Sequence, residues 1–136
     1  MKIGVPKEIK NHEYRVGLTP ASVREFVAHG HSVVVQAGAG AAIGLDDAQY
    51  RTAGATLVDS AQEVFAQADM VVKVKEPQPQ ECAMLRPGQV LYTYLHLAPD
   101  PEQTAGQLDW TEGPAPIPDS CRPSDPPPRQ RRRSPL

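Results

Sequence analysis

The fold is decided by a stretch that reads TPASVREFVAHGHSVVVQ over residues 19–36. Thr19 offers a hydroxyl N-cap, and Pro20 follows at the first helical position, where a missing N–H costs nothing. Apolar residues then recur at helical spacing until Gly30, which favours the end of the helix. Residues 31–36 follow with an apolar core that does not alternate with polar residues, which is typical of a strand in a parallel sheet. The stretch therefore predicts a helix that leads into a buried parallel strand.

Helix and strand alternate on both sides of this stretch. We expect its helix to bury Val23, Phe26 and Val27 between Ala21 and His29. Two further helices begin with capping boxes, in which a polar N-cap is followed three residues later by Glu or Gln: Asp46 with Gln49, and Ser60 with Glu63. The remaining predicted elements are strands over residues 2–5, 55–58, 70–75 and 90–96 and helices over residues 46–53, 60–66 and 79–85.

This alternation predicts an α/β fold, a parallel sheet with flanking helices that is Rossmann-like or flavodoxin-like. In such sheets the binding crevice lies beyond the carboxyl ends of the strands. The folded part is expected to span residues 1–108, which is enough for one domain with a modest core.

Composition changes abruptly after this part. Eight of the fifteen prolines fall within residues 109–136, and proline is excluded from helix interiors and central strands. We interpret this segment as a disordered tail. Its arginine cluster, residues 129–133, allows nonspecific nucleic-acid binding, but no aromatic residues are interleaved, so a solvated tail is the favoured interpretation.

The formal net charge of −2 gives the chain no electrostatic bias toward nucleic acid or a membrane surface. Its two cysteines, Cys82 and Cys121, are far apart and lack metal-ligand spacing, which argues for a reducing compartment. No apolar run approaches the roughly 20 residues that span a bilayer, and the start does not read as a signal peptide. We therefore expect a cytoplasmic protein.

Three residues placed near the ends of predicted strands carry the chemistry. Arg15 follows the first strand, Lys75 ends the fourth, and His96 ends the fifth. A guanidinium presents two parallel donors to a carboxylate, and an ammonium can contact a carboxylate or carbonyl oxygen. Imidazole titrates near neutrality and can move a proton beside them. Together they suggest an enzyme that acts on a small organic acid, with Arg15 and Lys75 as substrate ligands and His96 as the catalytic residue.

Each of these residues also has an ordinary structural interpretation. Arg15 fits a solvated loop, Lys75 fits a strand end that points to water, and His96 fits a hydrogen-bonded residue that closes a strand. Lys73 is two residues before Lys75 and competes for the same role, because alternate residues of a strand share a face. Tyr94 shares the face of His96 and is a further candidate for orienting the substrate.

The glycine-rich loop over residues 38–44 follows a strand, as a dinucleotide-binding loop does. Ile43 occupies the third glycine position, where only a residue without a side chain allows close packing of helix and strand. The carboxylate of Asp46 would repel a pyrophosphate at the start of the next helix. We therefore interpret the loop as a turn and assign no cofactor or metal to this chain.

Several motifs resemble the amino-terminal part of alanine dehydrogenases and the related nicotinamide nucleotide transhydrogenases. The resemblance covers residues 1–108, with mild departures at His12, Gly17 and Phe26. Its motifs are Gly4-Val5-Pro6-Lys7-Glu8, Lys10-Asn11, Glu13, Arg15-Val16, Thr19-Pro20, Gln36-Ala37-Gly38-Ala39-Gly40, Lys73-Val74-Lys75-Glu76-Pro77 and Tyr94-Leu95-His96-Leu97-Ala98. The pair of Lys75 and His96 resembles the alanine dehydrogenase branch, because transhydrogenases usually lack it.

The resemblance implies oxidative deamination of L-alanine to pyruvate and ammonium with NAD. It implies that Arg15 and Lys75 hold the carboxylate and carbonyl oxygen of pyruvate, with His96 as general acid and base. It also implies a homo-oligomer, often a hexamer, whose active site lies between two domains.

The family continues past residue 108 into an NAD-binding domain, which this sequence does not contain. We therefore expect an incomplete substrate domain that is inactive alone, because hydride transfer needs the nicotinamide held against the substrate. A frameshift or truncation is our hypothesis for the tail. The alternatives are a small-carboxylate binding module without redox chemistry and a nonfunctional remnant.

Overall fold

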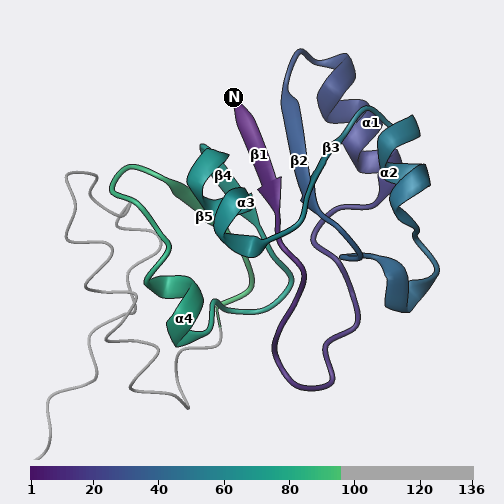
Figure 1. The fold of residues 1–136 in the computed structure, drawn as a ribbon. Helices are drawn as coiled ribbons and strands as arrows, with labels where there is room; N and C mark the ends of the chain where they lie inside the picture. Colours follow the sequence, from purple (N-terminus) through teal and green to yellow (C-terminus); the bar gives the residue numbers. More distant parts are fainter. Residues whose placement is uncertain (96–136) are drawn as a thin grey trace, which may run out of the picture.

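The computed structural model describes residues 1–95, which form an α/β fold (Figure 1). The strands are β1 (Lys2–Val5), β2 (Ser32–Gln36), β3 (Thr56–Val58), β4 (Met70–Val72) and β5 (Val90–Tyr92). The helices are α1 (Pro20–Ala28), α2 (Asp47–Thr52), α3 (Ala61–Gln67) and α4 (Pro79–Cys82), with a 3₁₀ helix η1 (Ala41–Ile43). His96 and the predicted tail over residues 109–136 lie outside the described residues.

The five strands form one parallel sheet in the order β3-β2-β1-β4-β5. The predicted parallel α/β class is therefore confirmed, and of the two doubly wound strand orders this is the Rossmann one. Strand β1 lies at the centre, where Gly4 pairs with Val34 of β2 and with Val71 of β4. The chain moves outward from β1 to β3 and then crosses back to β4, so the direction of winding changes between β1 and β4.

Alternate residues of the strands supply two separate cores, one on each face of the sheet. Ile3 and Val5 join the cluster under α1 and α2, whereas Val71 joins a second cluster with Phe65 and Ala68 of the α3 region. Figure 1 shows α1 and α2 on the opposite side of the sheet from α3. Both faces are covered, which explains why the strand residues are apolar without polar alternation.

The helix starts follow the predicted caps. The Thr19 side chain accepts a hydrogen bond from the Ser22 amide, and both predicted capping boxes, at Asp46 and at Ser60, are present. Val27 is a correction, because its side chain is 36% exposed rather than buried. Its γ-carbons lie beside Gly54, which has no side chain to cover them.

Strands β4 and β5 are shorter than predicted, since they end at Val72 and Tyr92. The Lys73 amide still donates to the Tyr92 carbonyl oxygen, but the Val74 amide donates to a side chain, Glu8 Oε1, at 2.7 Å. A carboxylate from the loop after β1 thus replaces the next strand partner and ends the ladder. Lys75 therefore lies in a loop three residues beyond β4.

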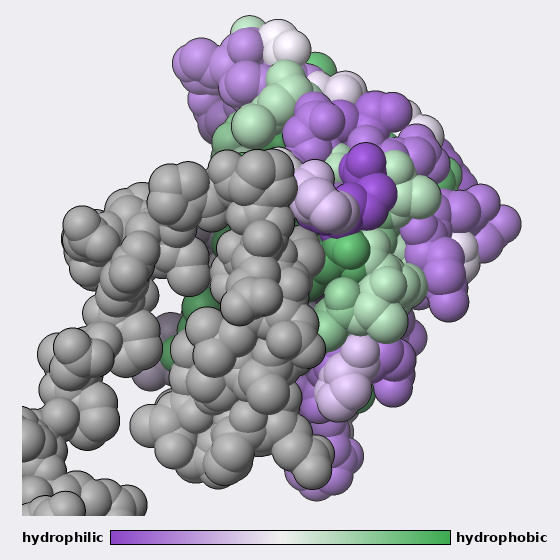
Figure 2. All heavy atoms as spheres, turned by 90° about the vertical axis from the view of Figure 1, so that its left-hand side faces the viewer, coloured by the Kyte–Doolittle hydropathy of each residue, from purple (hydrophilic) through white to green (hydrophobic). Residues whose placement is uncertain are grey.

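Apolar side chains remain exposed on β5 and just after it. The exposed fractions are 48% for Val90, 70% for Tyr92, 67% for Tyr94 and 46% for Leu95. Figure 2 views the molecule from the side on which β5 lies in Figure 1; where no grey atoms cover it, apolar and hydrophilic residues lie side by side. Among the described helices, none has the length and apolar character needed to cross a membrane.

Candidate functional site

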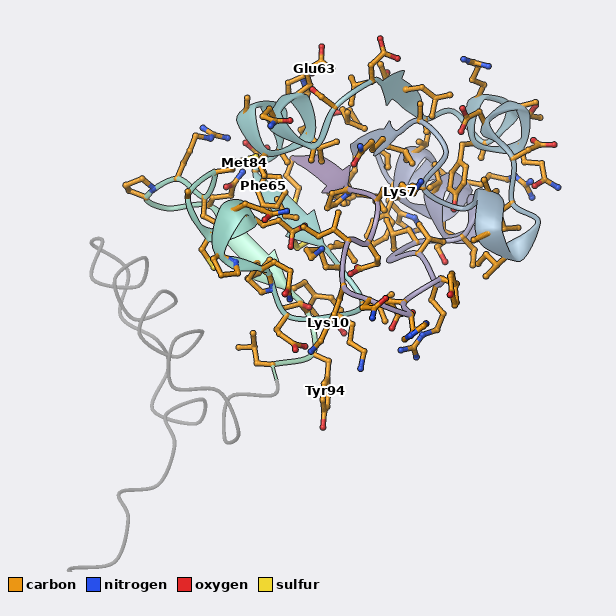
Figure 3. All side chains as sticks on the ribbon, turned by 60° about the horizontal axis from the view of Figure 1, so that its bottom comes forward. Lys7, Lys10, Glu63, Phe65, Met84 and Tyr94 are labelled. Carbon is orange, nitrogen blue, oxygen red and sulfur yellow. The ribbon has the colours of Figure 1, made fainter. Side chains whose placement is uncertain are left out.

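The candidate site is built from the loops that follow β1 and β4, the two strands between which the winding changes direction. In doubly wound sheets the crevice outside the carboxyl ends of the strands at such a point is where ligands bind. Arg15 lies on the loop after β1, and Lys75 lies on the loop after β4. Figure 3 turns this edge of the sheet toward the viewer, with Lys7 and Lys10 of the first loop labelled.

The two loops are in direct contact. A Cβ at Gly17 would lie 2.5 Å from the Val72 carbonyl oxygen, so the segment after Arg15 rests on the end of β4. Only glycine at residue 17 tolerates such an approach of two backbones. The same two loops are also joined by an ion pair between Lys10 and Glu76. Among the non-glycine residues described, only His12, in the loop after β1, has a positive φ.

Arg15 lines a hollow of about 290 Å³ at this edge. Its Nε and Nη2 donate to the two carboxylate oxygens of Glu13 at 2.8 and 2.6 Å. The Arg15 side chain is 62% exposed, whereas that of Glu13 is only 5% exposed. The hollow is lined by Lys7, Glu8, Glu13, Tyr14, Arg15, Ala39 and Ala42.

The electrostatics of the hollow couple Arg15 and Lys75 through Glu13. Hydrogen bonds from Arg15 lower the pKa of Glu13 to about 2, and the charge of Lys75 acts in the same direction. The same pairing raises the pKa of Arg15, and Glu8 contributes to that rise. Both predicted substrate ligands thus lie within electrostatic range of one carboxylate.

Lys75 is half-buried, and the Thr93 hydroxyl donates to its carbonyl oxygen at 2.8 Å. This bond ties the Lys75 backbone to the segment after β5. The next residue, Glu76, is nearly buried; burial alone would raise its pKa, but the hydrogen bond from Lys10 and the charges of Lys10 and Lys75 lower it. The charge of Lys75 therefore favours the ionised form of two carboxylates, Glu13 and Glu76.

Lys73 has a different environment from Lys75, although the two share a face of the predicted strand. Its side chain is 0% exposed, and its Nζ lies 2.7 Å from Glu81 Oε1 and 3.2 Å from Glu8 Oε2. A buried ammonium between two carboxylates is a structural ion cluster rather than an open ligand site. From the sequence, Lys73 was only a competitor of Lys75 for the role of substrate ligand. No local pattern indicated that Glu8 and Glu81 would pair with it.

Tyr94 lies after β5 with its side chain 67% exposed, and Figure 3 shows it pointing away from the fold. The described contacts do not bring it to Arg15, so its predicted role in orienting the substrate stays a prediction. His96, the predicted catalytic residue, lies outside the described residues.

The glycine-rich loop does not fit a dinucleotide. The Gly38 amide, which would have to face a pyrophosphate, donates to Asp47 Oδ1 at 2.8 Å. A carboxylate in that position repels a phosphate, and α2 is only six residues long. We predicted this repulsion from Asp46, but Asp46 caps α2 and Asp47 is the residue that occupies the loop. Within residues 1–95, no group of three His, Cys, Asp or Glu side chains is placed to hold a metal ion.

Comparison with known proteins places the whole site in one family segment. Residues 4–109 match the family model described as "Alanine dehydrogenase/PNT, N-terminal domain". An alanine dehydrogenase from Halomonas elongata is 54% identical over 109 residues, which cover 80% of this chain and 29% of the relative. One from Bacillus subtilis is 51% identical over 102 residues, which cover 75% of this chain and 27% of the relative. This chain thus spans about three tenths of the length of such relatives.

Solved structures give the same picture. An L-alanine dehydrogenase structure superposes with a TM-score of 0.77 at 50% identity, over 80% of this chain and 30% of that one. A transhydrogenase from Sinorhizobium meliloti superposes with a TM-score of 0.75 at 28% identity, over 81% of this chain and 32% of that one. The backbones are similarly close, but the sequence is nearer to the alanine dehydrogenase.

Proposed function

The chain belongs to the alanine dehydrogenase/PNT N-terminal domain family, and we propose that it carries the substrate-binding loops of an alanine dehydrogenase. Its ligand is a small 2-oxo or 2-amino carboxylate, pyruvate or L-alanine. The observation that supports this most is the contact between the loops after β1 and β4, together with the action of the Arg15 and Lys75 charges on the same carboxylate, Glu13. The reaction of the whole enzyme is the oxidative deamination of L-alanine to pyruvate and ammonium.

Arg15 is proposed to bind the substrate carboxylate. Glu13 takes the Nε edge of the guanidinium, so the Nη1 side of its fork faces the ligand. Lys75 is proposed to contact the carbonyl oxygen of pyruvate, where an ammonium stabilises the negative charge that develops when the carbon becomes tetrahedral. His96 is proposed as the general acid and base that exchanges a proton at that carbon's substituent.

NAD is the proposed hydride carrier of the whole reaction. The glycine-rich loop does not fit it, because the Asp47 carboxylate occupies the Gly38 amide. We further propose that the 136-residue chain does not turn over substrate on its own. A cytoplasmic location and a homo-oligomeric assembly, often hexameric in the family, are further proposals, and sedimentation of the purified chain tests the second.

A stand-alone module that binds small carboxylates without redox chemistry is the alternative from the sequence. The family match does not favour it, since the motifs around Arg15 and Lys75 lie in a segment about half identical to alanine dehydrogenases. A nonfunctional remnant would fold poorly and would not bind pyruvate, and a binding measurement separates it from our proposal.

Calorimetric titration of the purified chain with pyruvate tests the proposed function. We expect saturable binding that Arg15→Ala weakens by about ten- to a hundredfold, because a hydrogen bond to a charged group contributes about 1.5–3 kcal/mol. Lys75→Ala should weaken it as well. The matched control is Arg24→Ala, which removes an exposed arginine from α1. Binding that is absent, or that survives Arg15→Ala unchanged, would contradict the proposal.

A further inference from the structure

A buried cluster of three charged side chains lies directly behind the site. Lys73 is 0% exposed, Glu8 is 2% exposed and Glu81 is 1% exposed. Each carboxylate accepts one hydrogen bond from the Lys73 ammonium and one from a backbone amide: Glu8 from Val74 at 2.7 Å, and Glu81 from Gln78 at 2.8 Å. The two carboxylates therefore have the same chemistry, but they hold different segments.

Glu8 is the member that joins the two loops of the site. It comes from the loop that carries Arg15, and it binds the residues on both sides of the Lys73–Val74 peptide, next to Lys75. It also lines the hollow beside Arg15 and acts on the Arg15 charge. Glu81 instead holds the start of α4, which bears none of the proposed ligands.

An independent contact points the same way. Gly17, two residues after Arg15, lies against the Val72 carbonyl, one residue before Lys73. The Arg15 segment is thus fastened to the Lys75 segment on both sides, by backbone packing at Gly17 and by the ion cluster at Glu8. A small ligand that contacts both cations, with its carboxylate at Arg15 and its 2-oxygen at Lys75, requires the separation of the two loops to be held in this way.

We infer that Glu8 and Lys73 are positioning residues, which fix the separation of Arg15 and Lys75 and so select a short 2-oxo carboxylate. The ligand part of this inference rests on the proposed function. Simple electrostatics makes the opposite prediction for Glu8, because removal of a negative charge beside Arg15 should strengthen the binding of an anion. Whether removal of the Glu8 charge weakens or strengthens anion binding therefore distinguishes a positioning role from a purely electrostatic one.

Glu8→Gln is the decisive variant, and Glu81→Gln is its matched control. In both variants one carboxylate still pairs with Lys73, so each is expected to fold. The amide at residue 8 can accept from only one of its two former partners, because its NH₂ side would face a donor.

We expect Glu8→Gln to weaken pyruvate binding by about tenfold or more, since small misplacements of binding groups carry large costs. Glu81→Gln should change it by less than about threefold, because Glu81 holds the start of α4 and not the loops that carry Arg15 and Lys75. Binding by Glu8→Gln that equals or exceeds that of the parent chain would overturn the inference, as would equal losses in both variants.

Hydrogen exchange followed by NMR tests the positioning without a ligand. In Glu8→Gln the amides of residues 73–76 and 13–17 should exchange faster than in the parent chain, while those of α1 and α3 stay unchanged. If the parent chain binds no pyruvate, the proposed function fails, and this measurement alone decides the positioning. Unchanged exchange in both loops would refute it.

Discussion

At the scale of single residues, the pair of Glu13 and Arg15 decides how the site meets a ligand. Glu13 is almost fully covered, and its two oxygens bind the Nε and Nη2 of Arg15. A guanidinium has five donors in a rigid fork, so this carboxylate orients the group and leaves the outer donors to a ligand.

The titration of Glu13 follows from this pairing. Its pKa is about 2 in the folded chain against an ordinary 4.5, so the pairing stabilises the fold above pH 4.5. That contribution is lost as the pH falls from 4.5 toward 2, because the folded-state value is the lower one. A carboxyl-detected NMR titration should show the Glu13 midpoint far below 4.5, and Arg15→Gln should move it upward. Arg24→Gln should leave it where it was, whereas a midpoint near 4.5 in the parent chain would show that the pair does not form.

At the scale of elements, the central strand shows how packing on two faces depends on one glycine. Ile3 and Val5 point to one core, and Gly4 faces α3 between them. A Cβ at Gly4 would lie 2.6 Å from the Ala68 Cβ and 2.8 Å from Val64 Cγ1. Helix α3 therefore lies close against β1 because residue 4 has no side chain.

Gly4→Ala should destabilise the fold by about 1–3 kcal/mol through overpacking, although alanine is the better strand residue. Urea denaturation of the parent and variant measures this difference. Adding Ala68→Gly should recover part of the loss, because it removes the nearer of the two clashing atoms. A Gly4→Ala chain as stable as the parent would mean that α3 lies farther from β1.

The elements also show what local sequence patterns could predict. The starts of α1, α2 and α3 were predicted correctly, because a cap and its partner lie within three residues of each other. The ends of β4 and β5 were not predicted correctly. The Val74 amide, which would have continued the ladder, donates instead to Glu8, a residue 66 positions away in the sequence. The loop position of Arg15 followed from the predicted end of the first strand, whereas the buried partners of Lys73 required the folded chain.

At the scale of the whole molecule, the Lys73 cluster connects segments that are distant in the sequence. Glu8 lies 65 residues before Lys73, and the cluster joins the loop after β1, the end of β4 and α4. This junction lies where the winding of the sheet changes direction, behind the two loops that carry Arg15 and Lys75. The stability of the fold and the geometry of the site therefore depend on the same buried charges.

Lys73→Met should unfold much of the population. The variant leaves two buried carboxylates without a cation, which costs about 3–5 kcal/mol, a large share of the roughly 5–15 kcal/mol that stabilises a domain. Thermal unfolding followed by circular dichroism measures the loss. Combining Lys73→Met with Glu8→Gln and Glu81→Gln should restore most of it, because no unpaired charge remains. A stable Lys73→Met chain would contradict the burial of this cluster.

The most direct test of the site is a pyruvate titration of the ¹⁵N-labelled chain followed by amide NMR spectra. We predict saturable shifts in residues 13–17 and 73–76, the two loops that carry Arg15 and Lys75, and at His96, and their loss in Arg15→Ala. Shifts that are absent, or that fall elsewhere on the sheet, would contradict the account.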